Sequence, residues 1–220
     1  MGEQPRRGVT LKLATSLDGR IATAAGESRW ITGPQARAEV HRLRAAHDAV
    51  LAGIETVLAD DPELTVRLDG YERPQPARVV LDSRLRLPLT AKLVQTAWAV
   101  PTYLVCTGEP SGALAAAGVR MLPVAAAGDG RPALEAALKA LAAEGLERIM
   151  VEGGGQVAAS FLRGDLVDRI EWFRAPLLLG AEGRPGIGPL ALSELAASPR
   201  FRRMEATPVG DDLWERYERL

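Results

Sequence analysis

Short apolar runs that favour β-strands alternate with helix-forming segments along most of this chain, and this alternation limits the fold more than any other feature. The pattern predicts strands over 8–16, 48–53, 78–82, 102–106, 118–122, 146–151 and 167–175. It predicts helices over 33–46, 132–144 and 156–163, with a single helical turn over 54–58. The last part of the chain predicts a hairpin of strands 201–206 and 213–220. Strands that alternate with helices are typical of α/β proteins. We therefore expect a mixed, mostly parallel sheet flanked by helices, with a C-terminal antiparallel hairpin.

Charge and cysteine content exclude several classes of protein. The 220 residues carry 27 basic and 28 acidic side chains, which gives a net charge of −1. A general nucleic-acid or membrane-surface binder shows a basic excess, so we expect neither partner. Cys106 is the only cysteine, which excludes an intrachain disulfide and a Cys-based zinc site, and we expect no bound metal. We expect a cytoplasmic chain that forms one domain over 1–220, with residues 1–7 as a flexible terminus.

A glycine-rich segment follows the predicted strand 146–151. Gly153, Gly154 and Gly155 stand between this strand and the next predicted helix. Backbone N–H groups can approach an anion closely there, and the helix N-terminus adds a partial positive charge. With Ala158 the segment also fits the looser dinucleotide pattern G-x-G-x-x-A. Its place two-thirds along the chain argues against a Rossmann domain, and a plain tight turn is the alternative to phosphate binding.

Two further loops carry polar residues that suit an anionic ligand. Ser83 and Arg84 directly follow the predicted strand 78–82, where an α/β sheet binds ligands, and they would suit a 2′-phosphate. Residues 60–67 combine acids, a proline and Arg67 in one loop. A solvated loop explains the first pair equally well, and a proline turn with a capping Asp explains the second.

Isolated charged residues leave structural and functional interpretations open. Lys12 lies in an alternating Leu strand, either facing a sheet edge or buried in a site, and Glu152 is either a surface acid or a cleft carboxylate. His41 and His47 have no partner at metal-ligand spacing, and we interpret both as structural. The sequence contains no G-x-S-x-G, H-E-x-x-H or Walker A motif, so it gives no support to a hydrolase or an NTPase.

Taken together, these segments resemble a known family. The stretches 11–22, 26–32 and 56–67, followed in the same order by 80–83 and Val-Glu-Gly-Gly-Gly at 151–155, closely resemble the reductase domain of the bifunctional riboflavin-biosynthesis deaminase/reductase. The resemblance covers about residues 8–220, and the stretch 11–67 is its most specific part. It implies a dihydrofolate-reductase-like fold and NADPH-dependent reduction of 5-amino-6-(5-phosphoribosylamino)uracil to the ribitylamino product.

The same resemblance implies roles for individual residues. The substrate-binding residues are then Ser28, Arg44, Leu64, Arg67 and Glu152, with the two arginines and Ser28 on the substrate phosphate. Two guanidinium groups and a hydroxyl suit a phosphate dianion. The residues at the NADPH site are then Ala14, Trp30, Thr56, Asp60, Ser83, Gly154, Gly155, Gln156, Val157, Ala158, Ala159 and Ser160.

Lys12 and Asp60 are the two candidates for the proton that the ring-opened imine of the substrate must gain, and the sequence does not rank them. The family's deaminase carries H-x-E and P-C-x-x-C motifs that this chain lacks, so we expect no deamination by this chain. One alternative is a separate deaminase as partner, and another is a paralogue that reduces a dihydropterin or dihydrofolate-like substrate. A non-catalytic nucleotide-binding protein is a third. Family members are usually dimers, so we expect a homodimer.

Overall fold

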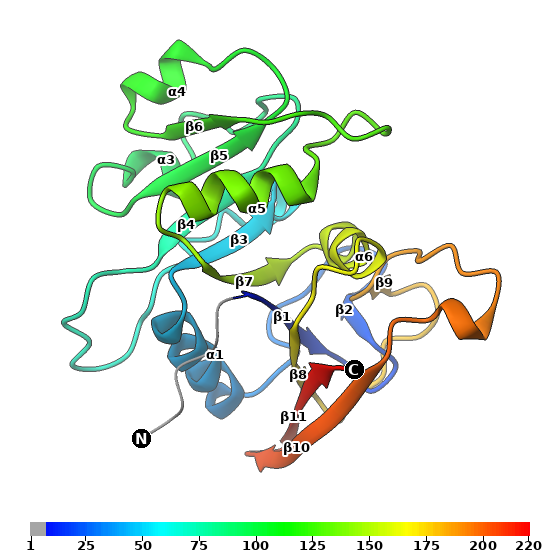
Figure 1. Cartoon of the computed structure of the whole chain (residues 1–220). Coiled ribbons are helices and arrows are strands. Elements are labelled where there is room, and N and C mark those ends of the chain that lie inside the picture. The colour runs from blue at the N-terminus through cyan, green and yellow to red at the C-terminus, as the bar shows by residue number, and fades with distance from the viewer. Residues whose placement is uncertain (1–7) are drawn as a thin grey trace. The chain divides into compact units, whose positions relative to one another are not determined.

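The computed structural model describes residues 8–220, and the predicted flexible terminus 1–7 lies outside them. This part of the chain forms two compact units (Figure 1). The first unit contains Gly8 and His41–Met150, and the second contains Val9–Val40 and Val151–Leu220. Helix α1 (Pro34–Ala46) and strand β7 (Arg148–Gly153) each contribute residues to both units. Because two compact units can belong to one domain, the single domain over 1–220 stays a prediction.

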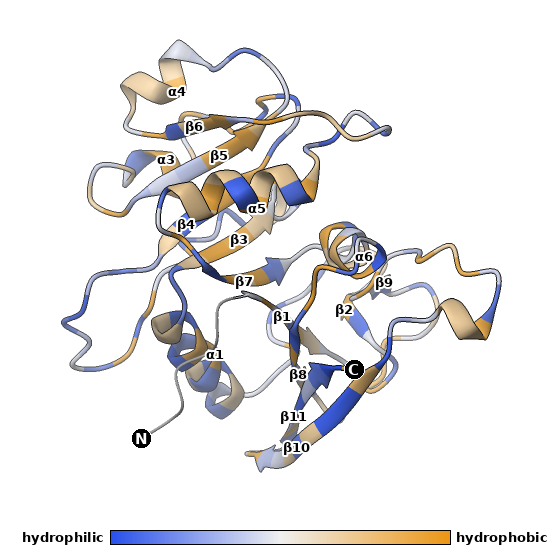
Figure 2. Cartoon of the chain, viewed as in Figure 1, coloured by the Kyte–Doolittle hydropathy of each residue, from blue (hydrophilic) through white to orange (hydrophobic). Residues whose placement is uncertain are grey.

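The first unit is built on parallel strands. The hydrogen-bonded order is β7, β3 (Ala49–Gly53), β4 (Ala77–Leu81), β5 (Thr102–Cys106) and β6 (Arg120–Pro123). The pairs β3–β4, β4–β5 and β5–β6 are all parallel. The helices of this unit are α2 (Ile54–Asp60), α3 (Lys92–Gln95), α4 (Gly112–Ala116) and α5 (Leu134–Ala143). Parallel strands buried on both faces read as continuous apolar runs, and Figure 2 shows β3 in hydrophobic colours.

The second unit combines parallel and antiparallel pairs. Its order is β10 (Phe201–Val209), β11 (Asp212–Arg219), β8 (Arg169–Arg174), β1 (Gly8–Thr15) and the end of β7. Strand β1 pairs with β8 in parallel, whereas β11 pairs antiparallel with both β8 and β10. Helix α6 (Gly155–Arg163) buries Ala158, Ala159, Phe161 and Leu162. The mixed, mostly parallel sheet and the C-terminal hairpin that the sequence predicts are both confirmed.

Several short elements have no counterpart in the sequence analysis. Strands β2 (Arg20–Ala22) and β9 (Arg184–Pro185) pair with each other across a long stretch of chain. Helices α3 and α4 have four and five residues, and Leu195–Ala197 forms a 3₁₀ turn. Elements this short contain too little periodic pattern to be detected in a sequence.

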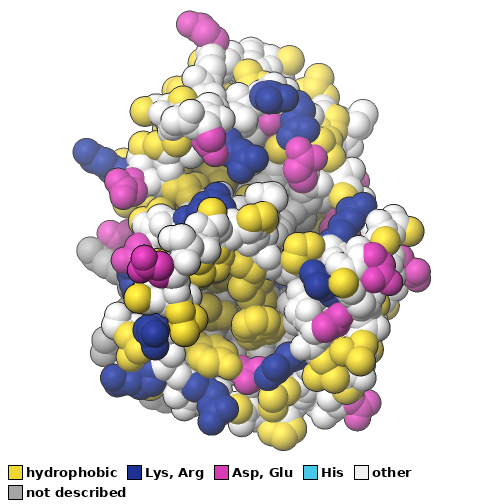
Figure 3. All heavy atoms as spheres, turned by 90° about the vertical axis from the view of Figure 1, so that its right-hand side faces the viewer, with side chains coloured by type: hydrophobic (Ala, Val, Ile, Leu, Met, Phe, Trp, Pro, Cys, Tyr) yellow, Lys and Arg dark blue, Asp and Glu magenta, His cyan; other side chains and the backbone are white. Residues whose placement is uncertain are grey.

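The surface carries charges of both signs. Figure 3 shows one face on which Lys and Arg side chains and Asp and Glu side chains are both scattered. Among residues 8–220, no helix combines the length and the apolar character needed to cross a membrane.

Candidate functional site

Lys12 lies in a central strand and forms a largely buried ion pair. In the second unit β1 stands between β8 and β7, so Lys12 does not face a sheet edge. Its Nζ lies 3.8 Å from Oε2 of Glu152 on β7, and the two side chains are only 14% and 7% exposed. Burial of an ammonium group is tolerated when a carboxylate compensates its charge. The structure therefore brings together two of the predicted site residues, one catalytic and one substrate-binding.

The N-terminus of α6 presents the glycine-rich segment. Gly154 precedes the helix with φ 46° and ψ 151°, a backbone conformation that residues other than glycine rarely adopt. No side chain caps the helix, so its first N–H groups remain suited to an anion. Gly155 has a different reason to be glycine, because a Cβ there would lie 2.5 Å from the carbonyl oxygen of Pro185.

Residues 156–160 of α6 lie partly at the surface and partly in the core. Gln156 is exposed and Val157 half-buried, so both stand on the open first turn of the helix. Ala158 and Ala159 are only 2% and 0% exposed, and their side chains pack in the core of the second unit. Ser160 accepts a hydrogen bond from Arg163 Nη2 at 3.1 Å. Of the predicted cofactor residues 154–160, the first four thus occupy positions from which a ligand can be bound at the helix N-terminus.

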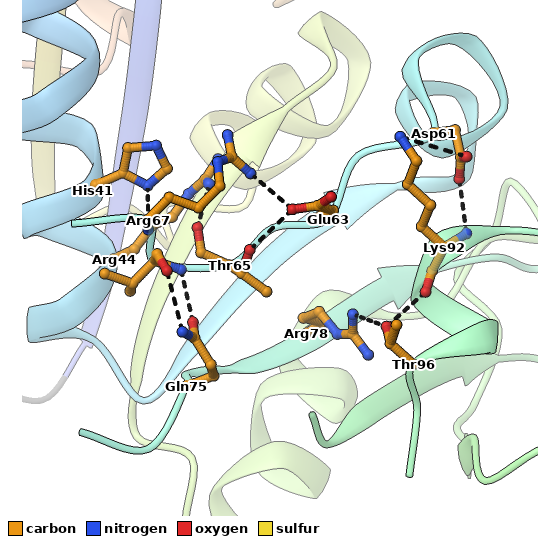
Figure 4. A network of polar contacts seen from close by, with 11 residues as sticks. His41, Arg44, Asp61, Glu63, Thr65, Arg67, Gln75, Arg78, Lys92 and Thr96 are labelled. Atoms are coloured by element: carbon orange, nitrogen blue, oxygen red, sulfur yellow. Dashed lines mark hydrogen bonds and ion pairs between the residues drawn. The ribbon is translucent and has the colours of Figure 1, made fainter. Parts of the chain in front are cut away.

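The loop between α2 and β4 gathers the arginines predicted to bind phosphate (Figure 4). Arg44 Nη1, on α1, donates to the carbonyl oxygen of Thr65 at 2.7 Å. Arg67 Nη1 donates to Glu63 Oε2 at 3.2 Å, and its side chain is 55% exposed. Arg44 itself is only 9% exposed. Both guanidinium groups therefore belong to one polar network within the first unit.

Leu64 lies in the same loop but points inward. Its side chain is 3% exposed and packs in the apolar core of the first unit. Its φ of +53° is unusual for a leucine. Any substrate contact by Leu64 must therefore come from its backbone rather than from its side chain.

Asp60 and Thr56 lie on α2. Thr56 is half-buried on this helix, and Asp60 is its exposed last residue. The next residue, Asp61, ends the helix in a left-handed conformation and accepts the backbone N–H of Lys92 at 2.9 Å. The hydrogen bond between Asp61 and Lys92 fixes the loop directly after Asp60.

Ser83 and Arg84 lie in a turn organised by a buried acid. Asp82 is 0% exposed, and its carboxylate accepts the backbone N–H groups of Arg84 at 3.3 Å and of Leu87 at 2.8 Å. Within residues 8–220 the Arg84 guanidinium makes no ion pair, whereas Arg86 Nη2 lies 2.5 Å from Glu55 Oε1. The turn therefore presents one uncommitted guanidinium beside the Ser83 hydroxyl.

The remaining predicted residues lie in the second unit. Ser28 and Ala14 are half-buried. Trp30 is 66% exposed, and the Arg37 guanidinium stacks on its ring at 4.4 Å from the centroid. An exposed indole with a stacked cation offers a flat surface to another ring.

His41 is a residue whose role the sequence analysis missed. Its Nδ1 accepts the backbone N–H of Arg67 at 3.2 Å (Figure 4). The contact joins residues 26 positions apart, so no local pattern could reveal it.

Glu171 is a second buried acid outside the predicted site. It lies on β8 opposite Lys12 of β1 and is only 7% exposed. Burial raises its pKa to about 7, against the opposing effects of the hydrogen bond from Trp214 and the charges of Arg216 and Arg169. In the part of the chain that the structure describes, no cluster of three or more His, Cys, Asp or Glu residues could hold a metal ion.

Comparison with known proteins identifies the family. The family model of the RibD C-terminal domain matches residues 7–214. The chain belongs to this family. It is 39% identical to the riboflavin biosynthesis protein RibD of Aquifex aeolicus over 212 residues. This match covers 96% of this chain and 57% of that protein. It therefore spans little more than half the length of the first RibD relatives that it matches.

A second relative is close to this chain in length. The 2,5-diamino-6-ribosylamino-4(3H)-pyrimidinone 5′-phosphate reductase of Methanothermobacter thermautotrophicus is 36% identical over 211 residues, 95% of this chain and 96% of that protein. A solved structure of Acinetobacter baumannii RibD matches with a TM-score of 0.86 and 33% identity, over 97% of this chain and 58% of that one. The dihydrofolate-reductase-like fold that the sequence implies is thereby confirmed.

Proposed function

We propose that this protein is an NADPH-dependent reductase of riboflavin biosynthesis that converts 5-amino-6-(5-phosphoribosylamino)uracil to its 5-phosphoribitylamino product. The observation that carries the proposal is the buried pair of Lys12 and Glu152 in a chain that matches a pyrimidinone phosphate reductase over nearly its full length. A buried cation beside an acid is expected where a reaction needs a positioned proton donor. A non-catalytic nucleotide-binding protein has no need for this pair.

Lys12, Asp60 and Glu152 are proposed to have separate roles in the reaction. The nicotinamide, when bound, supplies the hydride. Lys12 carries three N–H donors, and the ion pair with Glu152 limits the directions in which they point. We propose that Lys12 or Asp60 donates the proton that the imine nitrogen gains, while Glu152 keeps the Lys12 side chain in place.

Arg44 and Arg67 are proposed to bind the phosphate of the substrate. A guanidinium has five N–H donors, and the contacts of Arg44 to Thr65 and of Arg67 to Glu63 hold both guanidinium groups beside the same loop. Both arginines are attached to one loop, which suits a doubly charged ligand better than an uncharged one. A dihydropterin carries no phosphate, so this network favours a phosphorylated pyrimidine.

The residues present also suit a phosphorylated dinucleotide as cofactor. The uncapped α6 N-terminus suits a pyrophosphate, and the Ser83–Arg84 turn suits a 2′-phosphate. We therefore propose NADPH as the cofactor of a cytoplasmic homodimer.

The test is NADPH oxidation, followed by near-UV absorbance, with the phosphoribosylaminouracil, the corresponding 2,5-diaminopyrimidinone phosphate and dihydrofolate as parallel substrates. We expect turnover with the uracil. The diaminopyrimidinone is the second candidate, because the relative with that activity matches this chain over 96% of its own length. Turnover with dihydrofolate alone, or cofactor binding without turnover, contradicts the proposal.

Two variants examine the assigned roles. Lys12→Met removes the ammonium group, and we expect kcat to fall by about 10²–10⁴-fold if Lys12 is the proton donor. An unchanged kcat in this variant assigns the proton to Asp60 instead.

Arg84→Ala removes the uncommitted guanidinium of the Ser83 turn. We expect it to weaken binding of 2′,5′-ADP by about tenfold in calorimetry and to leave 5′-ADP unaffected, because only the 2′-phosphate distinguishes the two ligands. Arg86→Ala is the matched control, since Arg86 is already paired with Glu55. Equal effects of the two variants contradict this assignment.

A further inference from the structure

The loop Asp61–Pro76 is unusual in its length and in its attachments. It connects α2 to β4 and contains no helix or strand. Loops of this length without secondary structure are uncommon and usually functional. Ordering such a loop on ligand binding costs conformational entropy unless the protein has already fixed it.

Two sets of contacts fix the centre of this loop (Figure 4). Gln75 binds the backbone of Val66 on both sides, accepting its N–H at 2.7 Å and donating to its carbonyl oxygen at 3.1 Å. From α1, Arg44 donates to the carbonyl oxygen of Thr65 at 2.7 Å. His41 accepts the backbone N–H of Arg67 at 3.2 Å. These contacts hold three consecutive residues of the loop.

His41 and Arg44 act on the loop from the same side of α1. They are three positions apart, so their side chains lie on one face of the helix. One contact holds the backbone directly at Arg67, and the other places Arg44 against the carbonyl oxygen of Thr65, two residues earlier in the loop. The contact that His41 makes therefore holds the backbone from which the Arg67 side chain projects.

The hydrogen bond also specifies the form of the imidazole. Nδ1 can accept an N–H only when it carries no proton, so the contact requires the tautomer whose proton is on Nε2. The contact needs an acceptor at the position of Nδ1 rather than an imidazole as such. An asparagine at position 41 can supply this acceptor with its Oδ1 atom, whereas a leucine of nearly the same shape cannot.

We propose that His41 is a positioning residue that holds the backbone of Arg67, and with it the Arg67 guanidinium, in place for the phosphate of the substrate. The inference rests on the proposed function, since it needs a phosphate at Arg44 and Arg67. In this role His41 acts through Arg67, so we expect its effect on binding of the phosphorylated substrate and not on the chemical step.

The experiment compares His41→Leu with His41→Asn. His41 is half-buried, so neither variant creates a large cavity. We expect His41→Leu to raise KM for the phosphorylated pyrimidine about five- to tenfold, as expected for one lost hydrogen bond. The value of kcat and the KM for NADPH stay within about twofold. His41→Asn restores KM to within about twofold of the wild-type value.

A second measurement detects the contact without any turnover. Amide hydrogen exchange of the peptide that contains Arg67 is expected to be faster in His41→Leu than in the wild type and close to wild type in His41→Asn. This measurement shows whether the tether exists, and the kinetics show whether it serves the phosphate.

The outcomes separate the two proposals. If the wild-type protein reduces the phosphorylated pyrimidine and the Leu and Asn variants share one KM, the role of His41 is overturned and the proposed function stands. If the wild-type protein reduces neither phosphorylated pyrimidine, the proposed function fails, and the phosphate role of His41 fails with it even where exchange shows the tether. A fall in kcat with unchanged KM also overturns the positioning role.

Discussion

Glu171 is expected to make the protein less stable as the pH rises. Its folded-state pKa is about 7, against 4.5 for the unfolded chain. Below pH 4.5 both states bind the proton and the group contributes nothing. Between pH 4.5 and 7 the unfolded state releases its proton first, so the free energy of unfolding falls. Above pH 7 the full difference applies, and 7 against 4.5 corresponds to about 3 kcal/mol.

Glu171→Gln removes this ionisation and keeps an oxygen that can accept the Trp214 Nε1–H, which donates at 2.7 Å in the wild type. The new amide N–H groups lose water, at a cost of about 1 kcal/mol. We expect the variant to be about 2 kcal/mol more stable than the wild type at pH 8 and nearly equal at pH 5. For a chain of this size, 2 kcal/mol corresponds to a Tm increase of roughly 4–8 °C.

The assay is urea unfolding of both proteins at pH 5 and pH 8, which isolates Glu171 from all groups that the two proteins share. Glu218→Gln is the control, because Glu218 lies on the neighbouring strand and is 42% exposed. We expect no gain at pH 8 from this control. An equal effect of Glu171→Gln at both pH values refutes the assignment of the raised pKa to burial.

Two further predictions concern packing. Gly155→Ala places a Cβ 2.5 Å from the Pro185 carbonyl oxygen, and we expect the free energy of unfolding, measured in urea, to fall by about 2–3 kcal/mol. Gly112→Ala is the control: a Cβ there has no atom within 4 Å, and we expect this variant to be neutral or slightly more stable. Arg78 is 1% exposed, and its guanidinium donates to Thr96, Leu93, Val100 and Thr102. We expect Arg78→Ala to lower the free energy of unfolding by about 4 kcal/mol and Arg78→Met, which fills most of the volume, to lower it clearly less. Equal losses in the two variants would show that the hydrogen bonds matter rather than the volume.

The sequence predicts the parts of this fold that repeat a local pattern. The runs at 49–53 and 102–106 are entirely buried strands, and their apolar character is visible without any structure. The pairing of Arg20 with Pro185 depends on residues far apart in the chain, and no local propensity signals it. The same holds for α3 and α4, which are shorter than two turns of helix.

The candidate site divides in the same way. Lys12 is conspicuous in the sequence because a cation interrupts an apolar strand, but its partner Glu152 is 140 residues away, and only the strand order brings the two together. His41 gives no signal at all, since its contact is made with a backbone N–H rather than with a recognisable side chain. Ala158 belongs to a recognisable motif, yet the amphipathic packing of α6 turns its side chain, like that of Ala159, into the core.

The position of β1 has a consequence for synthesis on the ribosome. Its hydrogen-bonding partner β8 begins at Arg169. The carboxylate that accepts the Val9 N–H belongs to Asp168, which is synthesised 159 residues later. At about 5–20 residues per second, the first strand spends on the order of ten to thirty seconds without the strand that completes it. Leu11 and Leu13, both buried in the finished protein, lie on this strand. The first unit has all of its chain once Met150 is made, so it can fold while the first strand still lacks β8.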